Sequence, residues 1–371
     1  MAQSPHTPVT ILTGFLGSGK TTLLNRALRD PAMARTAVVI NEFGEISLDH
    51  VLAAKSDDTI MVLENGCLCC TVFGDLVATL NRLYHAREAN EIPRFDHVVI
   101  ETSGLADPTP IIQAFLSDPT LAGLYRIGAV IVTVDAVNGP GTLDQHVESV
   151  RQAALADHIL ITKLDLIEAD NAAVVQAALT ARLRRLNPAA RIARIDDPAL
   201  DAVALLRSAG LDPSDSSSDA RAWLNAAAYE YGHADHDHTG NDHYHEDHAD
   251  HFHGLHDRDI SSFCFIREQP IPREALRLLL EALQQNLGAN LLRVKGIIHV
   301  AEEPDRPAVI QGVQHLLHNL TWLDHWPDAD RRSKIVFITQ GYDRAEVEDM
   351  IAVLDRVAAR TAAARQRARG G

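Results

Sequence analysis

Residues 14–22, GFLGSGKTT, constrain the fold of this chain more than any other stretch. A β-branched apolar run at residues 9–12 precedes them, and an amphipathic segment at residues 23–28 follows them. This order is a strand, a glycine-rich loop and a helix, with the pattern G-x-x-x-x-G-K-[ST] complete. Backbone N–H groups of such a loop turn towards phosphate oxygens, and the positive end of the helix dipole adds to the attraction. The stretch therefore predicts a binding site for a nucleoside triphosphate.

Two side chains of this loop have expected chemical roles. Lys20 would reach the β- and γ-phosphates, and the hydroxyl of Thr21 would hold Mg²⁺. The other residues expected to contact the nucleotide here are Gly14, Gly17, Ser18, Gly19 and Thr22. A glycine loop that arose by chance is the alternative, which the flanking strand and helix disfavour.

Apolar runs alternate with helical stretches through the first half of the chain. The predicted strands are residues 9–12, 37–40, 60–63, 97–100, 129–134 and 158–161. Strands of nearly continuous apolar character indicate a mostly parallel sheet covered on both faces, the α/β fold class of P-loop NTPases. Ligands bind at the carboxyl ends of the strands in such sheets, so the polar residues that follow these runs are expected to form one site.

The run at residues 97–100 ends in ETSG, residues 101–104. In P-loop proteins an acidic residue at this position senses Mg²⁺. We expect Glu101 to act through a metal-bound water or to polarise the attacking water, and the N–H group of Gly104 to contact the γ-phosphate. A carboxylate that is merely solvated is the alternative.

The run at residues 158–161 ends in TKLD, with Thr162, Lys163 and Asp165 as candidate base-binding residues. The pattern resembles the [NT]-K-x-D loop that reads guanine. The Asp165 carboxylate would accept hydrogen bonds from guanine N1–H and the exocyclic amine, a pair of donors that adenine lacks. The stem of Lys163 would lie over the base plane. The loop therefore predicts GTP rather than ATP, with a plain surface loop as the alternative.

Three cysteines, Cys67, Cys69 and Cys70, stand between a predicted strand and the start of a helix. A helix N-terminus lowers the pKa of a thiol, and the thiolate is the form that binds metal. Three such donors can share one Zn²⁺, with a fourth ligand such as water, Glu42, a histidine or a client protein left open. A redox pair and buried inert cysteines are the alternatives.

A low-complexity segment rich in histidine, Asp and Glu occupies residues 232–256. Neutral imidazoles bind Zn²⁺, Ni²⁺, Co²⁺ or Cu²⁺, so the segment predicts auxiliary metal capture, with a solvated acidic linker as the alternative. Its nine histidines are His233, His236, His238, His243, His245, His248, His251, His253 and His256.

The composition narrows the class of protein. A formal charge of −16 argues against a general nucleic-acid binder, because most of the surface would repel phosphate. No apolar run approaches the length needed to cross a membrane, and the N-terminus lacks the pattern of a signal peptide. We therefore expect a cytoplasmic protein that partners neither nucleic acid nor membrane. The sequence leaves the oligomeric state open.

The second half of the chain is more irregular. The serine-rich residues 214–218 are typical of a linker, and a short helix is expected over residues 223–231. From residue 260 onward, short predicted strands at residues 291–300, 308–313 and 334–339 alternate with helices at residues 274–287 and 343–359. This order indicates a smaller α+β domain, with a frayed Arg/Ala tail at the end of the chain.

Together these motifs resemble the CobW-like family of P-loop GTPases, metallochaperones related to the GTPases that insert nickel into urease and hydrogenase. The likeness covers residues 9 to about 197, and residues 260–342 resemble the family's C-terminal domain, including LLRVKG at residues 291–296. The stretches that carry it are GFLGSGKTT, NEFGE at residues 41–45, ENGCLCC at 64–70, ETSGLADP at 101–108 and TKLD at 162–165. The resemblance implies GTP hydrolysis with Mg²⁺, a metal held by the three cysteines, and delivery of that metal to a client metalloprotein.

The sequence thus predicts a GTP-driven metallochaperone for Zn²⁺, with Co²⁺ as the alternative cargo for a corrinoid or nitrile-hydratase pathway. Lys20, Glu42 and Glu101 are the expected catalytic residues, and the loops of the two glutamates would tighten the thiolate site in the GTP state. A metal buffer or sensor and a small-metabolite kinase are the competing hypotheses. The expected domains are a GTPase domain at residues 9–200, a linker with the histidine segment at 201–257, a C-terminal domain at 258–345, and a helix with a basic tail at 346–371.

Overall fold

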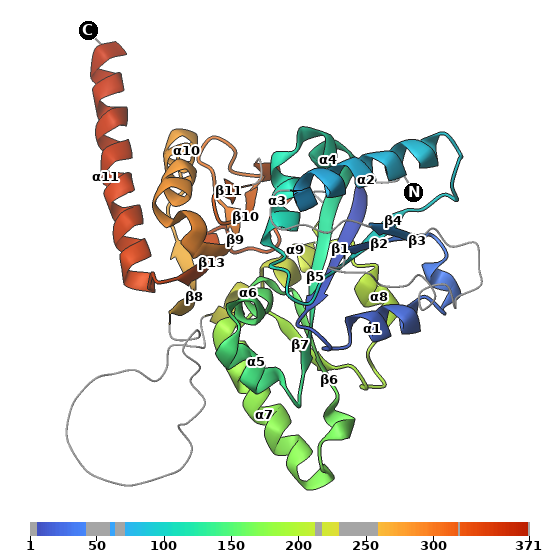
Figure 1. Cartoon of the computed structure of the whole chain (residues 1–371). Helices are drawn as coiled ribbons and strands as arrows, with labels where there is room; N and C mark the ends of the chain where they lie inside the picture. The colour runs from blue at the N-terminus through green and yellow to red at the C-terminus, as the bar shows by residue number, and fades with distance from the viewer. Residues whose placement is uncertain are drawn as a thin grey trace, which may run out of the picture. The chain divides into compact units, whose positions relative to one another are not determined.

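The computed structural model describes residues 6–41, 60–63, 71–211, 217–229, 259–317 and 320–369 (Figure 1). The chain divides into two compact units, Met1–Gly210 and Leu211–Gly371. Glu42, the three clustered cysteines and the nine histidines of the low-complexity segment lie outside the described residues.

The first unit is built on a seven-stranded sheet in the order β3-β2-β4-β1-β5-β6-β7, with every pair parallel. This confirms the predicted α/β fold class. The strands are β1 (Thr7–Gly14), β2 (Thr36–Asn41), β3 (Ile60–Leu63), β4 (His97–Thr102), β5 (Tyr125–Asp135), β6 (His158–Thr162) and β7 (Arg191–Arg194). All six expected strands are present, and β7 is an edge strand whose arginines gave no apolar signal.

Helices cover both faces of this sheet (Figure 1). One cluster joins Leu12 of β1 to Leu23 and Leu24 of the first helix and to Leu206 near the end of the unit, all at most 2% exposed. The described helices of the unit are α1 (Lys20–Ala27), α2 (Thr71–Glu88), α3 (Thr109–Ser117), α4 (Pro119–Leu124), α5 (Gly139–Gln145), α6 (Val147–Leu155), α7 (Ala169–Leu186) and α8 (Ala202–Leu206), with short 3₁₀ turns η1 (Pro31–Met33) and η3 (Leu164–Leu166).

The second unit is a smaller α+β domain around an antiparallel sheet, as the sequence predicts. Its strands follow the order β11-β10-β9-β13-β8, and β12 pairs with β10. Helices α10 and α11 pack on one face, where Phe263, Leu276, Phe337 and Ile351 share a buried core. The elements are β8 (Ile260–Arg267), α10 (Arg273–Ala282), π-helical η6 (Leu283–Leu287), η7 (Gly288–Asn290), β9 (Leu291–Ile298), β10 (Ala308–Val313), β11 (Leu316–Leu317), β12 (Thr321–Trp322), β13 (Ser333–Gln340) and α11 (Arg344–Arg369).

Two boundaries of this unit differ from the expectation. The helix expected over residues 223–231 is instead α9 (Ser217–Leu224), followed by the 3₁₀ turn η4 (Ala226–Tyr229). The break between them falls at Asn225, whose backbone is left-handed with φ 45° and so ends the α-helix. The Arg/Ala tail continues α11 to Arg369 instead of fraying after residue 359.

Residues 217–229, which fall in the expected linker range, are part of the second unit. The turn η4 contacts β8 and β13, and α9 contacts β9. Lys295 of β9 is 8% exposed, and its Nζ donates to the carbonyl oxygen of Trp223 at 3.2 Å and lies 4.7 Å from the centre of the indole ring. The segment therefore packs on the sheet through both a cation–π contact and a hydrogen bond.

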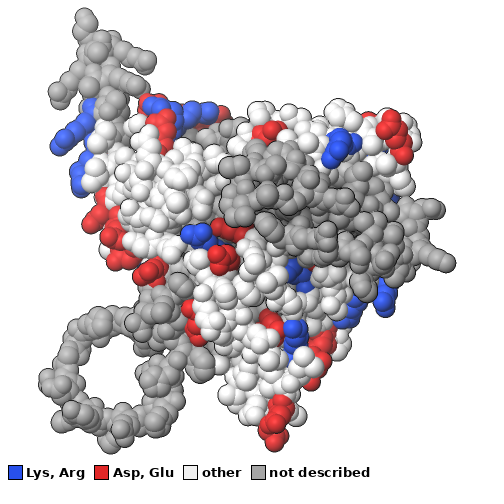
Figure 2. Space-filling view, viewed as in Figure 1, with Lys and Arg blue, Asp and Glu red and all other residues white. Residues whose placement is uncertain are grey.

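Charged side chains of both signs are interspersed over the described surface that Figure 2 shows. In the part of the chain that the structure describes, every helix is too short or too polar to cross a membrane.

Candidate nucleotide-binding site

The polar motifs of the first unit meet because of the strand order. β1 lies between β4 and β5, and β5 is followed by β6. Gly14 therefore pairs with Thr133, Leu12 pairs with Glu101, and Asp135 pairs with Thr162. The phosphate loop, the ETSG loop and the TKLD loop all leave the sheet at its carboxyl edge, as the sequence predicts.

Gly14 begins the phosphate loop in a conformation that only glycine adopts readily. Its φ is 138°, and a Cβ at this position would lie 2.4 Å from the carbonyl oxygen of Thr133. Ser18 is fixed against the same strand, because its Oγ lies 2.6 Å from the hydroxyl oxygen of Thr133. The loop is thus held close against β5 before it enters α1.

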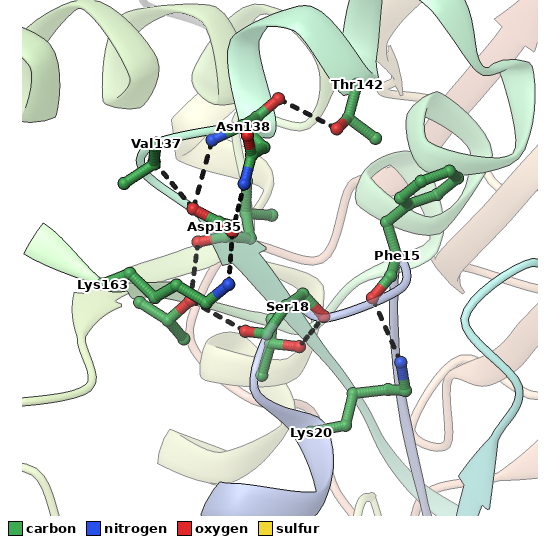
Figure 3. A network of polar contacts seen from close by, with 11 residues as sticks. Phe15, Ser18, Lys20, Asp135, Val137, Asn138, Thr142 and Lys163 are labelled. Atoms are coloured by element: carbon green, nitrogen blue, oxygen red, sulfur yellow. Dashed lines mark hydrogen bonds and ion pairs between the residues drawn. The ribbon is translucent and has the colours of Figure 1, made fainter. Parts of the chain in front are cut away.

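Lys20 closes the loop on itself (Figure 3). Its side chain is nearly buried, at 6% exposed, and its Nζ donates to the carbonyl oxygens of Gly14 at 2.8 Å and Phe15 at 3.1 Å. The ammonium group is therefore positioned inside the loop, where a phosphate oxygen could approach it. The ring of Phe15 also packs 4.5 Å from the ring of His146, which precedes α6.

Thr21 and Glu101 come together from two elements. The Thr21 hydroxyl donates to Glu101 Oε1 at 2.5 Å, and Glu101 at the end of β4 is 1% exposed. Next to it, the hydroxyl of Thr102 donates to that of Thr13 on β1 at 2.7 Å. A hydroxyl and a carboxylate are hard oxygen donors of the kind that Mg²⁺ prefers, so this pair fits the ion that the motif predicts.

Gly104 lies directly against the phosphate loop. A Cβ at Gly104 would be 2.5 Å from the backbone nitrogen of Leu16 and 2.6 Å from its Cα. Gln152 of α6, a buried residue that the sequence analysis did not identify, is hydrogen-bonded to the same loop. Its Nε2 donates to the carbonyl oxygens of Gly104 at 3.4 Å and Ala106 at 2.9 Å.

The TKLD loop is bonded to the phosphate loop. The hydroxyl of Thr162 donates to the carbonyl oxygen of Ser18 at 2.8 Å, and Thr162 is 3% exposed. Lys163 takes a left-handed backbone conformation with φ 60° and begins the turn η3. Asp165 follows on that turn with its side chain exposed, available to a base placed beside the loop.

Asp135 is a second residue that sequence reasoning missed, although it ends a predicted strand. It accepts from the backbone N–H groups of Val137 at 2.7 Å and Asn138 at 3.2 Å, from Asn138 Nδ2 at 3.0 Å and from Lys163 Nζ at 2.7 Å (Figure 3). Burial alone would raise the pKa of the Asp135 carboxyl, but hydrogen bonds from Lys163 and Asn138 outweigh it and lower the pKa. The carboxyl is therefore an anion at neutral pH.

Comparison with known proteins agrees with this geometry. Residues 8–194 match the CobW/HypB/UreG nucleotide-binding domain, and residues 260–354 match the C-terminal domain of the cobalamin synthesis protein CobW. The chain belongs to the CobW/HypB/UreG family. The resemblance that the motifs suggested is thus confirmed across both units.

Relatives of this CobW/HypB/UreG chain match it along nearly its whole length. Zinc chaperone YjiA of Escherichia coli K12 is 33% identical over 335 residues, which cover 89% of this chain and 93% of the relative. Zinc chaperone CobW of Pseudomonas aeruginosa is 32% identical over a 382-residue alignment that covers 93% of this chain and 90% of the relative. The crystal structure of the zinc-bound YjiA GTPase from E. coli matches with a TM-score of 0.66 at 28% identity, covering 95% of this chain and 99% of that one.

The metal-binding residues expected in this family member fall on segments outside the described residues. Within the described ranges, no group of three or more His, Cys, Asp or Glu residues could hold a metal ion. The strands that flank the expected site are described, however. β2 ends at Asn41 and β3 at Leu63; these two residues pair with each other, and Asn41 also pairs with Thr102 of β4. The chain therefore enters the glutamate and cysteine segments from the same sheet edge that carries the phosphate loop.

Proposed function

We propose that this chain is a GTP-hydrolysing metallochaperone that binds Zn²⁺ at Cys67, Cys69 and Cys70 and delivers it to a client metalloprotein. The nucleotide-binding part of this proposal rests on the hydrogen bond of Thr21 to Glu101, beside Lys20, which is bonded to the phosphate loop. The metal half is supported by the two relatives named zinc chaperones, which align with 89% or more of the chain. The expected compartment is the cytoplasm.

The described residues of the nucleotide site offer several groups that this proposal uses for GTP hydrolysis. Lys20 would supply a positive charge for the β- and γ-phosphates, and Thr21 and Glu101 would hold Mg²⁺, which neutralises phosphate charge when bound. In this proposal Glu101 would also polarise the attacking water. Thr162 anchors the TKLD loop to the phosphate loop, so that Asp165 can read a guanine whose phosphates lie in the loop.

The strand order supports a coupling between this site and the proposed metal site. Glu101 and Thr102 end β4, which lies between β1 with the phosphate loop and β2 with the strand end at Asn41. A shift of the ETSG loop on γ-phosphate binding would therefore act on the neighbouring segment that contains Glu42, our candidate for a further metal ligand. A tenfold to hundredfold change in metal affinity needs only about 1.4–2.8 kcal/mol of coupling. The histidine-rich segment would gather ions, and the C-terminal unit would present the surface for the client.

Two alternative functions are consistent with some of the same observations. A zinc buffer or sensor would use the same cysteines without coupling them to nucleotide, and cobalt delivery would use the same cycle with a different ion, because thiolates bind several divalent metals. Both differ from the proposal in measurable ways.

The deciding experiment measures Zn²⁺ and Co²⁺ affinity by chelator competition on the full-length chain with its nine clustered histidines replaced by asparagine. It is run once with Mg²⁺ and a non-hydrolysable GTP analogue and once with GDP. We expect zinc affinity to be about tenfold or more higher with the analogue. A Cys67, Cys69, Cys70→Ser triple variant is the control and should lose the nucleotide dependence.

Equal zinc affinity in the two nucleotide states would exclude the delivery cycle and favour the buffer or sensor. A nucleotide-dependent gain for Co²⁺ but not for Zn²⁺ would reassign the cargo. Retention of the nucleotide dependence in the triple cysteine variant would place the metal elsewhere in the chain.

A further inference from the structure

Asp135 links the elements that surround the base-reading loop (Figure 3). Its carboxylate receives four N–H donors, three of them from residues 137 and 138 and one from Lys163 Nζ at 2.7 Å. The Asp135 side chain is 8% exposed and that of Lys163 is 33% exposed. Donors from the following turn thus fix the carboxylate in place, while the lysine is the one member of this set that reaches it from another loop.

The TKLD loop is strained at the residue that Asp135 contacts. Lys163 has φ 60° and ψ 25°, a left-handed conformation that residues with a side chain adopt only at an energetic cost. Thr162 on one side is tied to Ser18. A charge-assisted hydrogen bond from the lysine head to a fixed carboxylate favours this conformation over the ordinary ones.

The same contact determines where the lysine stem runs. A Cβ placed on Gly17 would be 4.0 Å from Lys163 Nζ, so the head of the lysine lies beside the phosphate loop. The methylenes between that head and the backbone of Lys163 then span from the TKLD loop to the phosphate loop. This apolar stem is the surface on which a purine can lie. Asp165, two residues further on, can meet the edge of that purine only if the turn keeps its position.

We propose that Asp135 is a positioning residue for nucleotide specificity: by holding Lys163 it fixes the TKLD loop in the conformation from which Asp165 selects guanine. The inference rests on the proposed GTP-binding function. Asp135 does not contact the nucleotide in this account, and it acts only through Lys163.

The test compares the affinities of GDP, inosine diphosphate and ADP by calorimetry on the full-length protein. Inosine lacks the exocyclic amine of guanine, so the ratio of GDP to inosine diphosphate affinity reports the contact of Asp165 with that amine. The variants are D135N, K163M and the double variant. D135N keeps the shape of the side chain and removes its charge, and K163M keeps an apolar stem without the ammonium. The matched control is D144N. It neutralises Asp144 of α5, which forms an ion pair with Arg182 of α7 outside the Asp135 network.

For the wild type we expect GDP to bind about tenfold or more tightly than inosine diphosphate, since a hydrogen bond to a charged group is involved. D135N should reduce that ratio to below about threefold, K163M should do the same, and the double variant should show no further loss, as expected of residues that act in series. D144N should keep the wild-type ratio.

Three results would overturn the inference. If affinities for all three nucleotides fall together in D135N with an unchanged ratio, the residue supports the site as a whole and not its specificity. If the losses in D135N and K163M are additive, Asp135 does not act through Lys163. An unchanged D135N ratio also excludes the role, whereas a wild type that binds ADP as tightly as GDP contradicts the proposed function itself.

Discussion

The hydroxyl of Thr162 donates a hydrogen bond to the carbonyl oxygen of Ser18 at 2.8 Å, so the TKLD loop is bonded to the phosphate loop. Thr162 ends β6 and Ser18 precedes α1, and the fold brings the two residues together at one edge of the sheet. In the proposed function, the loops for the base and for the phosphates of one nucleotide would therefore be held at a fixed separation before the nucleotide binds.

Substitution of Thr162 by valine tests this connection. Valine has nearly the same shape but leaves the buried Ser18 carbonyl without this donor, so we expect a loss of about 1–2 kcal/mol in the free energy of unfolding and about tenfold weaker GDP binding. Urea denaturation and calorimetry measure the two effects. The control is T142V, which removes an exposed hydrogen bond to the Asn138 carbonyl and should change stability by less than about 0.5 kcal/mol. Equal effects of the two variants would contradict a special role for Thr162.

Substitution of Glu101 by glutamine should separate binding from hydrolysis. The amide keeps the size of the buried side chain but lacks the charge that, in the proposed function, would attract Mg²⁺ and polarise water. We expect GDP affinity without Mg²⁺ to stay within about threefold and GTP hydrolysis with Mg²⁺ to slow by about 100-fold or more. E281Q, on the exposed face of α10, is the control. A hydrolysis rate equal to that of the wild type would remove Glu101 from the mechanism.

Substitution of Gly104 by alanine should displace the ETSG loop. The new methyl group would meet backbone atoms of Leu16 at 2.5–2.6 Å, which cannot move aside without shifting the phosphate loop. We expect GTP hydrolysis to fall by about tenfold or more, because a misplaced loop no longer aligns the reacting groups. G141A is the matched control, since a Cβ there has no atom within 4 Å and alanine is favoured in the helix α5. Full activity in G104A would show that the loop accommodates the methyl group.

Lowering the pH should decrease the free energy of unfolding of the first unit because of His97. This residue, 2% exposed, lies at the start of β4 with its Nε2 3.0 Å from the Thr10 hydroxyl, and burial together with Arg207 lowers its pKa from 6.5 to about 4. Between these values the unfolded chain binds a proton that the folded chain does not, so stability falls as the pH decreases from 6.5 towards 4. The full loss is about 3 kcal/mol.

Urea denaturation at intervals from pH 7 to pH 4.5 measures this effect against an H97Q variant. The unfolding free energy of the wild type should decline more steeply with acid than that of H97Q. H325Q, which replaces an exposed histidine in the other unit, is the matched control. Parallel curves for the wild type and H97Q would mean that His97 takes up its proton in the folded state.

The main features of the site could be predicted because each motif follows an apolar strand. In a parallel sheet the strand ends meet, so the positions of Lys20, Glu101 and Asp165 on one edge follow from the periodicity of the sequence. The fold class follows from the same alternation. The C-terminal α+β unit was likewise visible as short strands between amphipathic helices.

The contacts between these motifs could not be predicted. Gln152 is one polar residue in an ordinary helical pattern, and its role depends on α6 packing behind the ETSG loop. The bond between Asp135 and Lys163 depends on the left-handed backbone at residue 163, which no residue type in the motif requires. The arginines of β7 gave no apolar signal, because an edge strand buries little of its surface.

Helix α9 and the turn η4 determine where an isolated fragment of the C-terminal unit should begin. Leu224 and Tyr229 are buried, and Trp223 contacts Lys295 of the sheet. All three precede residue 260, where the match to the family's C-terminal domain begins. A fragment beginning at residue 260 would expose that face to water and invite aggregation. A fragment that keeps this cover therefore begins near residue 211, where the second unit starts, and not at residue 260.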